Sequence, residues 1–302
     1  MSFALLFSGQ GTQHAGMFPW LIDDERVVEM RQRLGIIDWR RSLDDAHWAQ
    51  NNANAQTLLT GLALAAWNQL KPMVAPPAAI AGYSVGELAA FSAAGVLDSA
   101  DANALAPLRA SAMDRCASEM PGGLLAISGV APDTLRQVIA QTGLAVAIRN
   151  GVDSVVLGGP ESALDTALPI ALQAGAHCTR LRVAVASHTR WMLGAAESFA
   201  HTLSGITFHS PTTLLFSNSA DRIRDAATAK TALAAQIAQT VRWDECMENI
   251  ATRQVTCVLE LGPGQALTRM WNQRHASIPA RASDDFRSAS AIAAWLRSNS
   301  RV

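Results

Sequence analysis

The chain has 302 residues, 49% of them hydrophobic and only 16% charged, so it can bury a large core. Its 24 lysines and arginines balance 25 aspartates and glutamates, with no run of like charge, which argues against a surface for nucleic acid or membranes. No apolar run reaches the length of a membrane span, and the apolar N-terminus lacks the basic residues of a signal peptide. We therefore expect a cytoplasmic protein whose partners must be inferred from a site.

The cysteines show no CxxC spacing and lie in apolar segments, which is typical of buried thiols in a reducing compartment. They are Cys116, Cys178, Cys246 and Cys257. We expect neither a metal site nor disulfides.

Short apolar runs bounded by Gly, Ser or Asn alternate with longer stretches rich in Ala and Leu. This alternation predicts an α/β fold with a mostly parallel sheet covered on both faces. The predicted strands are Phe3–Ser8, Ala78–Tyr83, Thr213–Asn218 and Thr256–Leu261. The predicted helices are Gln56–Leu70, Val85–Ala94, Ala226–Gln239 and Asp244–Arg253. The segment 35–54 gives no clear pattern.

The pattern changes between Gly123 and Ala186. Here the predicted elements follow the order βαββαβ, which is the ferredoxin-like order. They are a strand at Leu124–Gly129, a helix opened near Pro132 and Asp133, strands at Leu144–Ile148 and Ser154–Leu157, a helix over Glu161–Ala174 and a strand at Cys178–Val185. We therefore predict a discontinuous large domain, 1–122 and 187–302, with a small ferredoxin-like domain, 123–186, inserted into it.

The most informative motif is Gly82-Tyr83-Ser84-Val85-Gly86, a G-x-S-x-G between a predicted strand and a predicted helix. In a hydrolase-like fold this context is the nucleophile elbow, where glycines allow a tight turn that exposes the serine hydroxyl at a helix N-terminus. The motif predicts that Ser84 is a nucleophile. An ordinary structural turn is the alternative.

A serine nucleophile needs a base within hydrogen-bond reach and a group that orients this base. His188 follows the predicted apolar strand Cys178–Val185 and lies at its end, where the sites of α/β sheets usually gather. His275 is its rival under a hydrolase interpretation, in which the histidine comes last in the chain.

Glycines also follow the first predicted strand, in Gly9-Gln10-Gly11. They would let the N–H of Gln10 approach a developing oxyanion, together with the N–H of Val85, the residue after the nucleophile. An ordinary glycine turn explains the same pattern.

Five segments resemble, in order, the motifs of malonyl-CoA:acyl carrier protein transacylases and related acyltransferase domains. They are FSGQGTQHAGM, AGYSVGELAAFSAAGV, ASHTRWM, QIAQTVRW and LELGPGQAL. The resemblance spans nearly the whole chain. It implies a malonyl transfer from coenzyme A to an acyl carrier protein, with no cofactor beyond the thioester substrate. Divergence within the motifs is similar to that of a specialised branch such as the epsilon subunit of malonate decarboxylase.

The resemblance also implies roles for single residues. Ser84 would be acylated and His188 would act as general base and acid. The carbonyl of Gln236 would orient His188, and the backbone N–H groups of Gln10 and Val85 would bind the oxyanion.

Arg109 would bind the malonyl carboxylate through a bidentate fork, as the family's arginine on the helix after the elbow helix does. A solvated arginine is the alternative. Pro107 predicts that this helix breaks or starts again, with Arg109 in a first turn. Other departures from the family's motifs are Tyr83, Ala110 and Thr240.

Two other functions remain open. An esterase or thioesterase of the α/β-hydrolase type would use Ser84 with His275, but the HGGG-type loop of that fold is absent from the sequence. A non-catalytic docking module for a carrier protein would not need the nucleophile, base and oxyanion glycines together.

Overall fold

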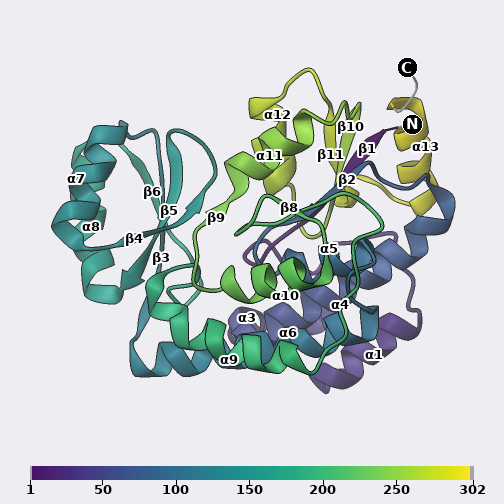
Figure 1. Cartoon of the computed structure of the whole chain (residues 1–302), viewed down its shortest axis with the longest axis horizontal. Helices are drawn as coiled ribbons and strands as arrows, with labels where there is room; N and C mark the ends of the chain where they lie inside the picture. Colours follow the sequence, from purple (N-terminus) through teal and green to yellow (C-terminus); the bar gives the residue numbers. More distant parts are fainter. Residues whose placement is uncertain (1, 300–302) are drawn as a thin grey trace.

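The computed structural model describes residues 2–299, in which two sheets organise the chain (Figure 1). The larger sheet has six strands in the order β11-β10-β1-β2-β7-β8. The strands from β11 to β7 are parallel to their neighbours, and β8 is antiparallel to β7. Their bounds are β1 Phe3–Phe7, β2 Ala79–Gly82, β7 Leu215–Phe216, β8 Arg222–Ile223, β10 Cys257–Leu261 and β11 Ala280–Ala282.

The smaller sheet has five strands in the order β6-β3-β5-β4-β9. Its first four strands pair antiparallel, whereas β9 pairs parallel with β4. The bounds are β3 Gly122–Ser128, β4 Ala145–Arg149, β5 Ser154–Pro160, β6 His177–Arg180 and β9 Val241–Arg242. The strand β9 comes from outside the range 123–186, so a later part of the chain completes this sheet.

Helices cover both sheets. Figure 1 shows α7 and α8 together on the outer side of the smaller sheet. The helices are α1 Glu25–Leu34, α2 Trp39–Ser42, α3 Ala46–Gln50, α4 Asn52–Leu70, α5 Gly86–Ala93, α6 Ser99–Glu119, α7 Pro132–Thr142, α8 Glu161–Gln173, α9 Leu193–Ser204, α10 Ala226–Ala235, α11 Trp243–Ala251, α12 Ala266–Arg274 and α13 Ala289–Asn299. None of the helices within residues 2–299 is long and apolar enough to cross a membrane.

The strand β1 is buried on both faces because its side chains alternate between two hydrophobic clusters. Phe3, Leu5 and Phe7 pack in one cluster with residues of α4, α5 and α6. Ala4 and Leu6 pack in another with residues of α11 and α12. A third cluster fills the space between the smaller sheet and α7 and α8. The layering puts the carboxyl ends of β1 and β2 side by side.

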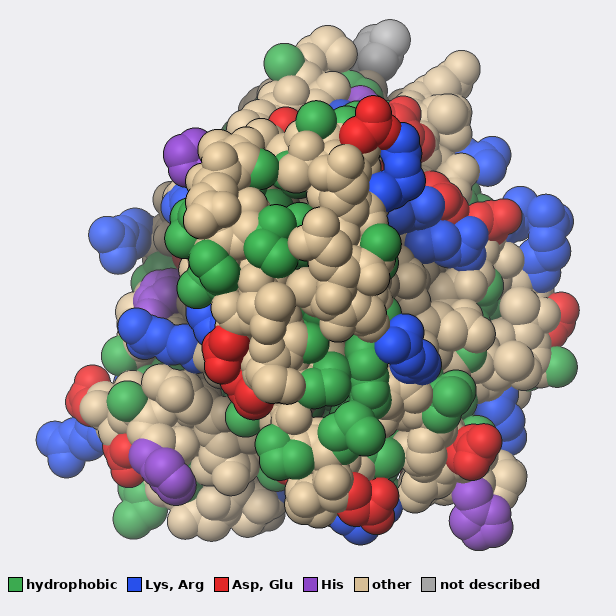
Figure 2. All heavy atoms as spheres, turned by 90° about the vertical axis from the view of Figure 1, so that its left-hand side faces the viewer, with side chains coloured by type: hydrophobic (Ala, Val, Ile, Leu, Met, Phe, Trp, Pro, Cys, Tyr) green, Lys and Arg blue, Asp and Glu red, His purple; other side chains and the backbone are tan. Residues whose placement is uncertain are grey.

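On the side of the molecule where the smaller sheet lies, the surface carries charges of both signs between hydrophobic side chains (Figure 2). This mixture agrees with the formal net charge of −1 for the chain.

The prediction of a mixed α/β fold is confirmed, with the order β3-α7-β4-β5-α8-β6 in the second sheet. The predicted strand Cys178–Val185 is wrong in its second half, since β6 ends at Arg180. The N–H of Leu181 still donates to the Leu124 carbonyl of β3 at 3.0 Å, but the strand does not continue beyond it. The alternating apolar residues Leu181, Val183 and Val185 line a cavity. Alternation shows which side chains are buried, not what buries them.

The prediction of a helix break at Pro107 is also wrong. The helix α6 continues through Pro107, so Arg109 lies near its middle and not in a first turn. A proline in a helix removes one backbone hydrogen bond. This loss is tolerated because α6 is 21 residues long and packs against α4, α5 and α9.

Candidate active site

Ser84 lies in a tight turn between β2 and α5. Its φ is 54°, in the left-handed region that non-glycine residues rarely adopt. Glycine is needed on both sides of this turn, because a Cβ on Gly82 would collide with Gly86, and a Cβ on Gly86 would collide with the Phe7 carbonyl. The sequence motif therefore forms the elbow that it predicts.

Asn218 braces this elbow, and no motif pointed to it. Its Oδ1 accepts a hydrogen bond from the Ser84 N–H at 2.7 Å, and its Nδ2 donates to the Gly82 carbonyl at 2.6 Å. Its own N–H donates to Glu87 Oε1 at 2.6 Å. The residue is fully buried just beyond β7, next to β2. Its position as the polar end of the predicted strand Thr213–Asn218 was the available signal.

Ser84 and His188 are within hydrogen-bond distance, with 2.8 Å between Ser84 Oγ and His188 Nε2. On the other side of the ring, Nδ1 lies 2.5 Å from the carbonyl oxygen of Gln236. Because a carbonyl can only accept, Nδ1 carries the proton and Nε2 is left to accept one from the serine. His188 also has a left-handed backbone, with a φ of 62°.

Burial, and second the charge of Arg109, lower the pKa of His188 to about 3, although the Gln236 carbonyl opposes this shift. The imidazole is therefore neutral at neutral pH. A neutral imidazole that is oriented by a carbonyl can take a proton from Ser84.

The loop after β1 carries Gln10 and lies at the same cavity as Ser84. Val85 directly follows the serine, and α5 begins at the next residue. The structure thus brings the two predicted oxyanion donors to the same end of the parallel strands as the nucleophile.

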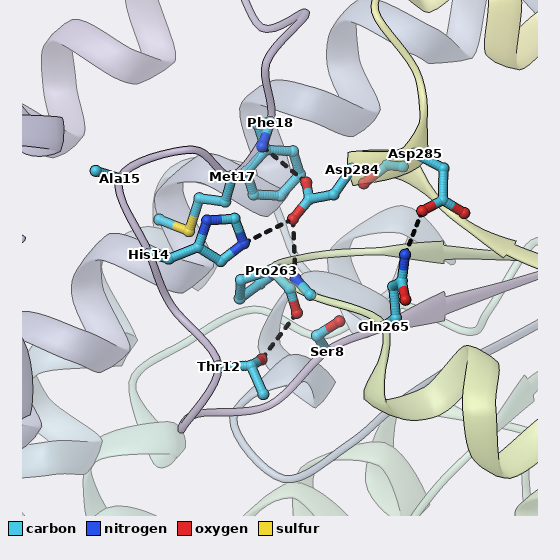
Figure 3. Close-up of polar contacts among 12 residues, drawn as sticks. Ser8, Thr12, His14, Ala15, Met17, Phe18, Pro263, Gln265, Asp284 and Asp285 are labelled. Atoms are coloured by element: carbon cyan, nitrogen blue, oxygen red, sulfur yellow. Dashed lines mark hydrogen bonds and ion pairs between the residues drawn. The ribbon is translucent and has the colours of Figure 1, made fainter.

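Asp284 holds this loop in place (Figure 3). One of its oxygens accepts a hydrogen bond from the Phe18 N–H at 2.7 Å. The other accepts from the Gly264 N–H at 2.9 Å and lies 3.3 Å from His14 Nε2. Thr12 adds a hydrogen bond to the Pro263 carbonyl at 2.8 Å, on the same turn after β10. The loop is thereby fixed at several points, although it has no regular structure.

Arg109 is 1% exposed, so it is not a solvated helix arginine. Its Nη1 donates to Gln56 Oε1 at 2.7 Å and its Nη2 to Gln236 Oε1 at 3.3 Å. Its Nε is buried and has no hydrogen-bond partner among the described residues. Burial lowers the pKa of Arg109 to about 10, and the charge of Glu87 opposes this, so the guanidinium stays charged at neutral pH.

Glu87 is fully buried on the elbow helix, beneath the turn. Burial raises its pKa to about 7 in spite of the hydrogen bond from the Asn218 N–H. It is thus a buried acid that the sequence analysis did not single out.

Several of the predicted site residues line one cavity of about 260 Å³. Ser84, His188 and Arg109 line it, and the walls are otherwise mostly apolar. Part of the wall comes from the smaller sheet, namely Leu124, Ala126, Ile148 and Val156. Such a space fits a small acyl group that has a reactive end at Ser84 and a negative end at Arg109.

His275, the alternative base, does not line this cavity. It follows α12, packs against Trp271 and lies 3.7 Å from a Glu248 oxygen. The hydrolase pairing of Ser84 with His275 is therefore contradicted. Within residues 2–299, no three His, Cys, Asp or Glu side chains are grouped so that they could hold a metal ion.

The geometry thus defines an α/β protein with two sheets, in which a serine–histidine pair and a buried arginine line the same cavity. The model of the acyl transferase domain family matches residues 44–301. The chain therefore belongs to this family.

Named relatives agree with this assignment. The malonyl CoA-acyl carrier protein transacylase of Mycobacterium tuberculosis is 33% identical over 291 residues, 92% of this chain and 95% of that protein. The protein of the same name from Escherichia coli K12 is 30% identical over 287 residues, covering 88% and 90%. No relative named here is a malonate decarboxylase subunit, so that branch gains no support.

Solved structures show the same fold. An acyl-carrier-protein S-malonyltransferase from Burkholderia pseudomallei superposes with a TM-score of 0.88 at 29% identity, covering 97% of this chain and all of that one. A malonyl-transacylase solved in complex with a type II PKS acyl-carrier protein gives a TM-score of 0.88 at 28% identity, covering 99% of this chain and 100% of that one.

Proposed function

We propose that this acyl transferase carries malonyl from coenzyme A to an acyl carrier protein through an ester on Ser84. The observation that supports malonyl is Arg109. A buried, charged guanidinium lines the same cavity as Ser84, and its Nε has no hydrogen-bond partner among residues 2–299. A free acyl carboxylate would supply that partner. The names of the relatives support the carrier protein as acceptor.

The proposed reaction has two half-steps. His188 Nε2 takes the proton of Ser84 as Oγ attacks the thioester carbonyl, and the N–H groups of Gln10 and Val85 stabilise the oxyanion. The carbon–sulfur bond then breaks, and the imidazolium returns the proton to the leaving thiolate of coenzyme A. In the second half-step, His188 deprotonates the thiol of the carrier protein, and the sulfur attacks the carbonyl carbon of the Ser84 ester. The bond between this carbon and Ser84 Oγ then breaks, and the imidazolium returns the proton to Oγ, which leaves the malonyl group on the carrier protein as a thioester. The carbonyl of Gln236 holds the ring in one tautomer throughout.

Intact mass spectrometry tests this proposal directly. The protein is mixed in turn with malonyl-CoA, acetyl-CoA and methylmalonyl-CoA, and then with an acyl carrier protein. We expect a stable malonyl adduct that disappears from the protein and appears on the carrier. Release of free malonate at the same rate without a carrier would instead indicate a hydrolase.

Two substitutions assign the roles. Ser84→Ala should gain no acyl mass, and His188→Ala should load about 10²–10⁴ times more slowly, the usual contribution of general acid–base catalysis. His275→Ala is the matched control and should load like the wild type, since His275 lies outside the cavity. An acyl adduct on Ser84→Ala would refute the nucleophile assignment.

A further inference from the structure

Arg109 is held by two neutral amides where an ion pair would be the usual arrangement for a buried arginine. Its acceptors in the described chain are the side-chain oxygens of Gln56 and Gln236. Gln56 is 1% exposed and Gln236 is fully buried. The guanidinium is therefore oriented by oxygens that do not neutralise it.

The orientation of the Gln56 amide follows from its other partners. Its Nε2 donates to Asn52 Oδ1 at 2.8 Å, and Asn52 Nδ2 donates to Asp114 Oδ1 at 2.8 Å. Asp114 can only accept while ionised, so the direction of the two amides is determined. Gln56 consequently presents its oxygen, and not its NH₂ group, to Arg109.

Gln236 is the more informative of the two. Its Nε2 is buried and has no hydrogen-bond partner among residues 2–299. A glutamate there would lose no hydrogen bond and would gain an ion pair with Arg109. Contacts within the protein itself therefore do not explain why residue 236 is a glutamine and not a glutamate.

Glu87 is the acid whose charge acts on Arg109. Its Oε1 accepts the hydrogen bond from the Asn218 N–H, and its pKa is raised to about 7 by burial. Near neutral pH a large part of the molecules thus carry Glu87 as a neutral acid, which leaves the positive charge of Arg109 uncompensated.

We infer that Gln56 and Gln236 are specificity-determining residues: they hold Arg109 with neutral oxygens and so reserve its charge for the free carboxylate of an acyl group. This inference rests on the proposed malonyl transfer and deepens it. A carboxylate at either position would occupy the guanidinium in the empty protein. The cavity would then favour uncharged acyl groups, such as acetyl.

The test measures the ratio of malonyl to acetyl loading on Ser84, by intact mass spectrometry, in Gln56→Glu and Gln236→Glu. We expect this ratio to fall by roughly 10- to 100-fold, the factor expected when charge-assisted hydrogen bonds to the substrate are lost. Gln56→Met and Gln236→Met are the matched controls, since they remove the oxygen without adding charge. Their ratio should fall by about fivefold or less, because each removes one hydrogen bond that orients Arg109 but leaves its charge free for the substrate.

Arg109→Ala separates this inference from the proposed function. If Arg109→Ala keeps the wild-type ratio, Arg109 does not select malonyl, and both its proposed role and the inference fail. If Arg109→Ala lowers the ratio but the Glu variants keep it, only the inference is overturned. Equal losses in the Glu and Met variants would also overturn it, because hydrogen bonding and not charge would then be responsible. Circular dichroism establishes folding, and Gln236→Glu decides alone if Gln56→Glu does not fold.

Discussion

Ser84 and His188 each have a left-handed backbone conformation, which residues other than glycine rarely adopt. Contacts with the surrounding structure hold them in it. For Ser84 these contacts come mainly from Asn218, which accepts from the serine N–H and donates to the Gly82 carbonyl. Without Asn218, the G-x-S-x-G motif alone would not hold the serine hydroxyl within hydrogen-bond distance of a base.

Replacing Asn218 with aspartate should therefore lower kcat more than it raises KM. The carboxylate keeps the acceptor for the Ser84 N–H but cannot donate to the Gly82 carbonyl, so the turn loses one of the two hydrogen bonds that Asn218 makes to it. We expect acyl loading to slow by about 10- to 100-fold. Steady-state kinetics with malonyl-CoA measure the effect.

Asn103→Ala provides the control, because Asn103 is also buried but lies on α6, and its Oδ1 has no hydrogen-bond partner among residues 2–299. It should reduce stability without slowing the reaction. An unchanged kcat in Asn218→Asp would show that Asn218 does not position the nucleophile.

Glu87 gives the fold a pH dependence. The unfolded chain releases the Glu87 proton near pH 4.5, whereas the folded protein keeps it up to about pH 7. The folded state binds more protons between these values, so this residue makes stability fall as the pH rises from 4.5 to 7. Glu87→Gln cannot ionise and should escape this loss.

The difference in unfolding free energy between Glu87→Gln and the wild type should therefore grow over this window, by on the order of 3 kcal/mol, and level off above it. Urea unfolding at pH 5, 6, 7 and 8 measures it. A difference that is constant over this range would mean that Glu87 titrates normally.

At the scale of elements, the loop after β1, which carries Gln10, depends on Asp284 for its position (Figure 3). Each carboxylate oxygen of Asp284 accepts from one N–H, that of Phe18 or that of Gly264. Asp284→Asn replaces one of these oxygens with an NH₂ group, which cannot accept, so one of the two hydrogen bonds is lost. We expect acyl loading to fall about tenfold, which is less than the 10²–10³ for outright loss of an oxyanion donor.

Hydrogen exchange in residues 9–18 should rise in the same variant. The neighbouring Asp285→Asn is the control, since Asp285 bonds Gln265 and Ala282 but not the loop. Equal effects of the two substitutions would show that the turn around residue 284 is only structural.

The elements of the fold differ in how well the sequence predicts them. The strands β1, β2 and β10 and the helices α4, α5 and α11 were predicted to within a few residues, because glycines and apolar runs mark them locally. The end of β6 and the continuity of α6 were not, because long-range packing decides them. For the site, Ser84 and the resemblance-based residues come from motifs, whereas Asn218 and Gln56 are isolated polar residues whose roles exist only in three dimensions.

For the whole molecule, we propose that the predicted division into a large domain and an inserted small one applies, within residues 2–299, with close coupling between the two. The strand β9 joins the smaller sheet, and Thr240 Oγ1 donates to the Val146 carbonyl at 2.7 Å. Arg149 forms ion pairs with Asp244 and Glu245. Both parts also wall the same cavity.

We therefore expect one cooperative unfolding transition in urea, with coincident curves from far-UV circular dichroism and tryptophan fluorescence. Thr240→Val should lower the unfolding free energy by about 1 kcal/mol without separating the curves. Two resolved transitions would show that the small domain unfolds by itself.

The left-handed backbone at Ser84 and His188 also bears on how such a protein can evolve. Each of these conformations costs on the order of 1–3 kcal/mol, so the chain would be more stable if either turn relaxed. Selection for stability alone would thus favour substitutions that erase the site, and only selection for activity can retain it. The rest of the fold must carry enough surplus stability to tolerate that permanent strain.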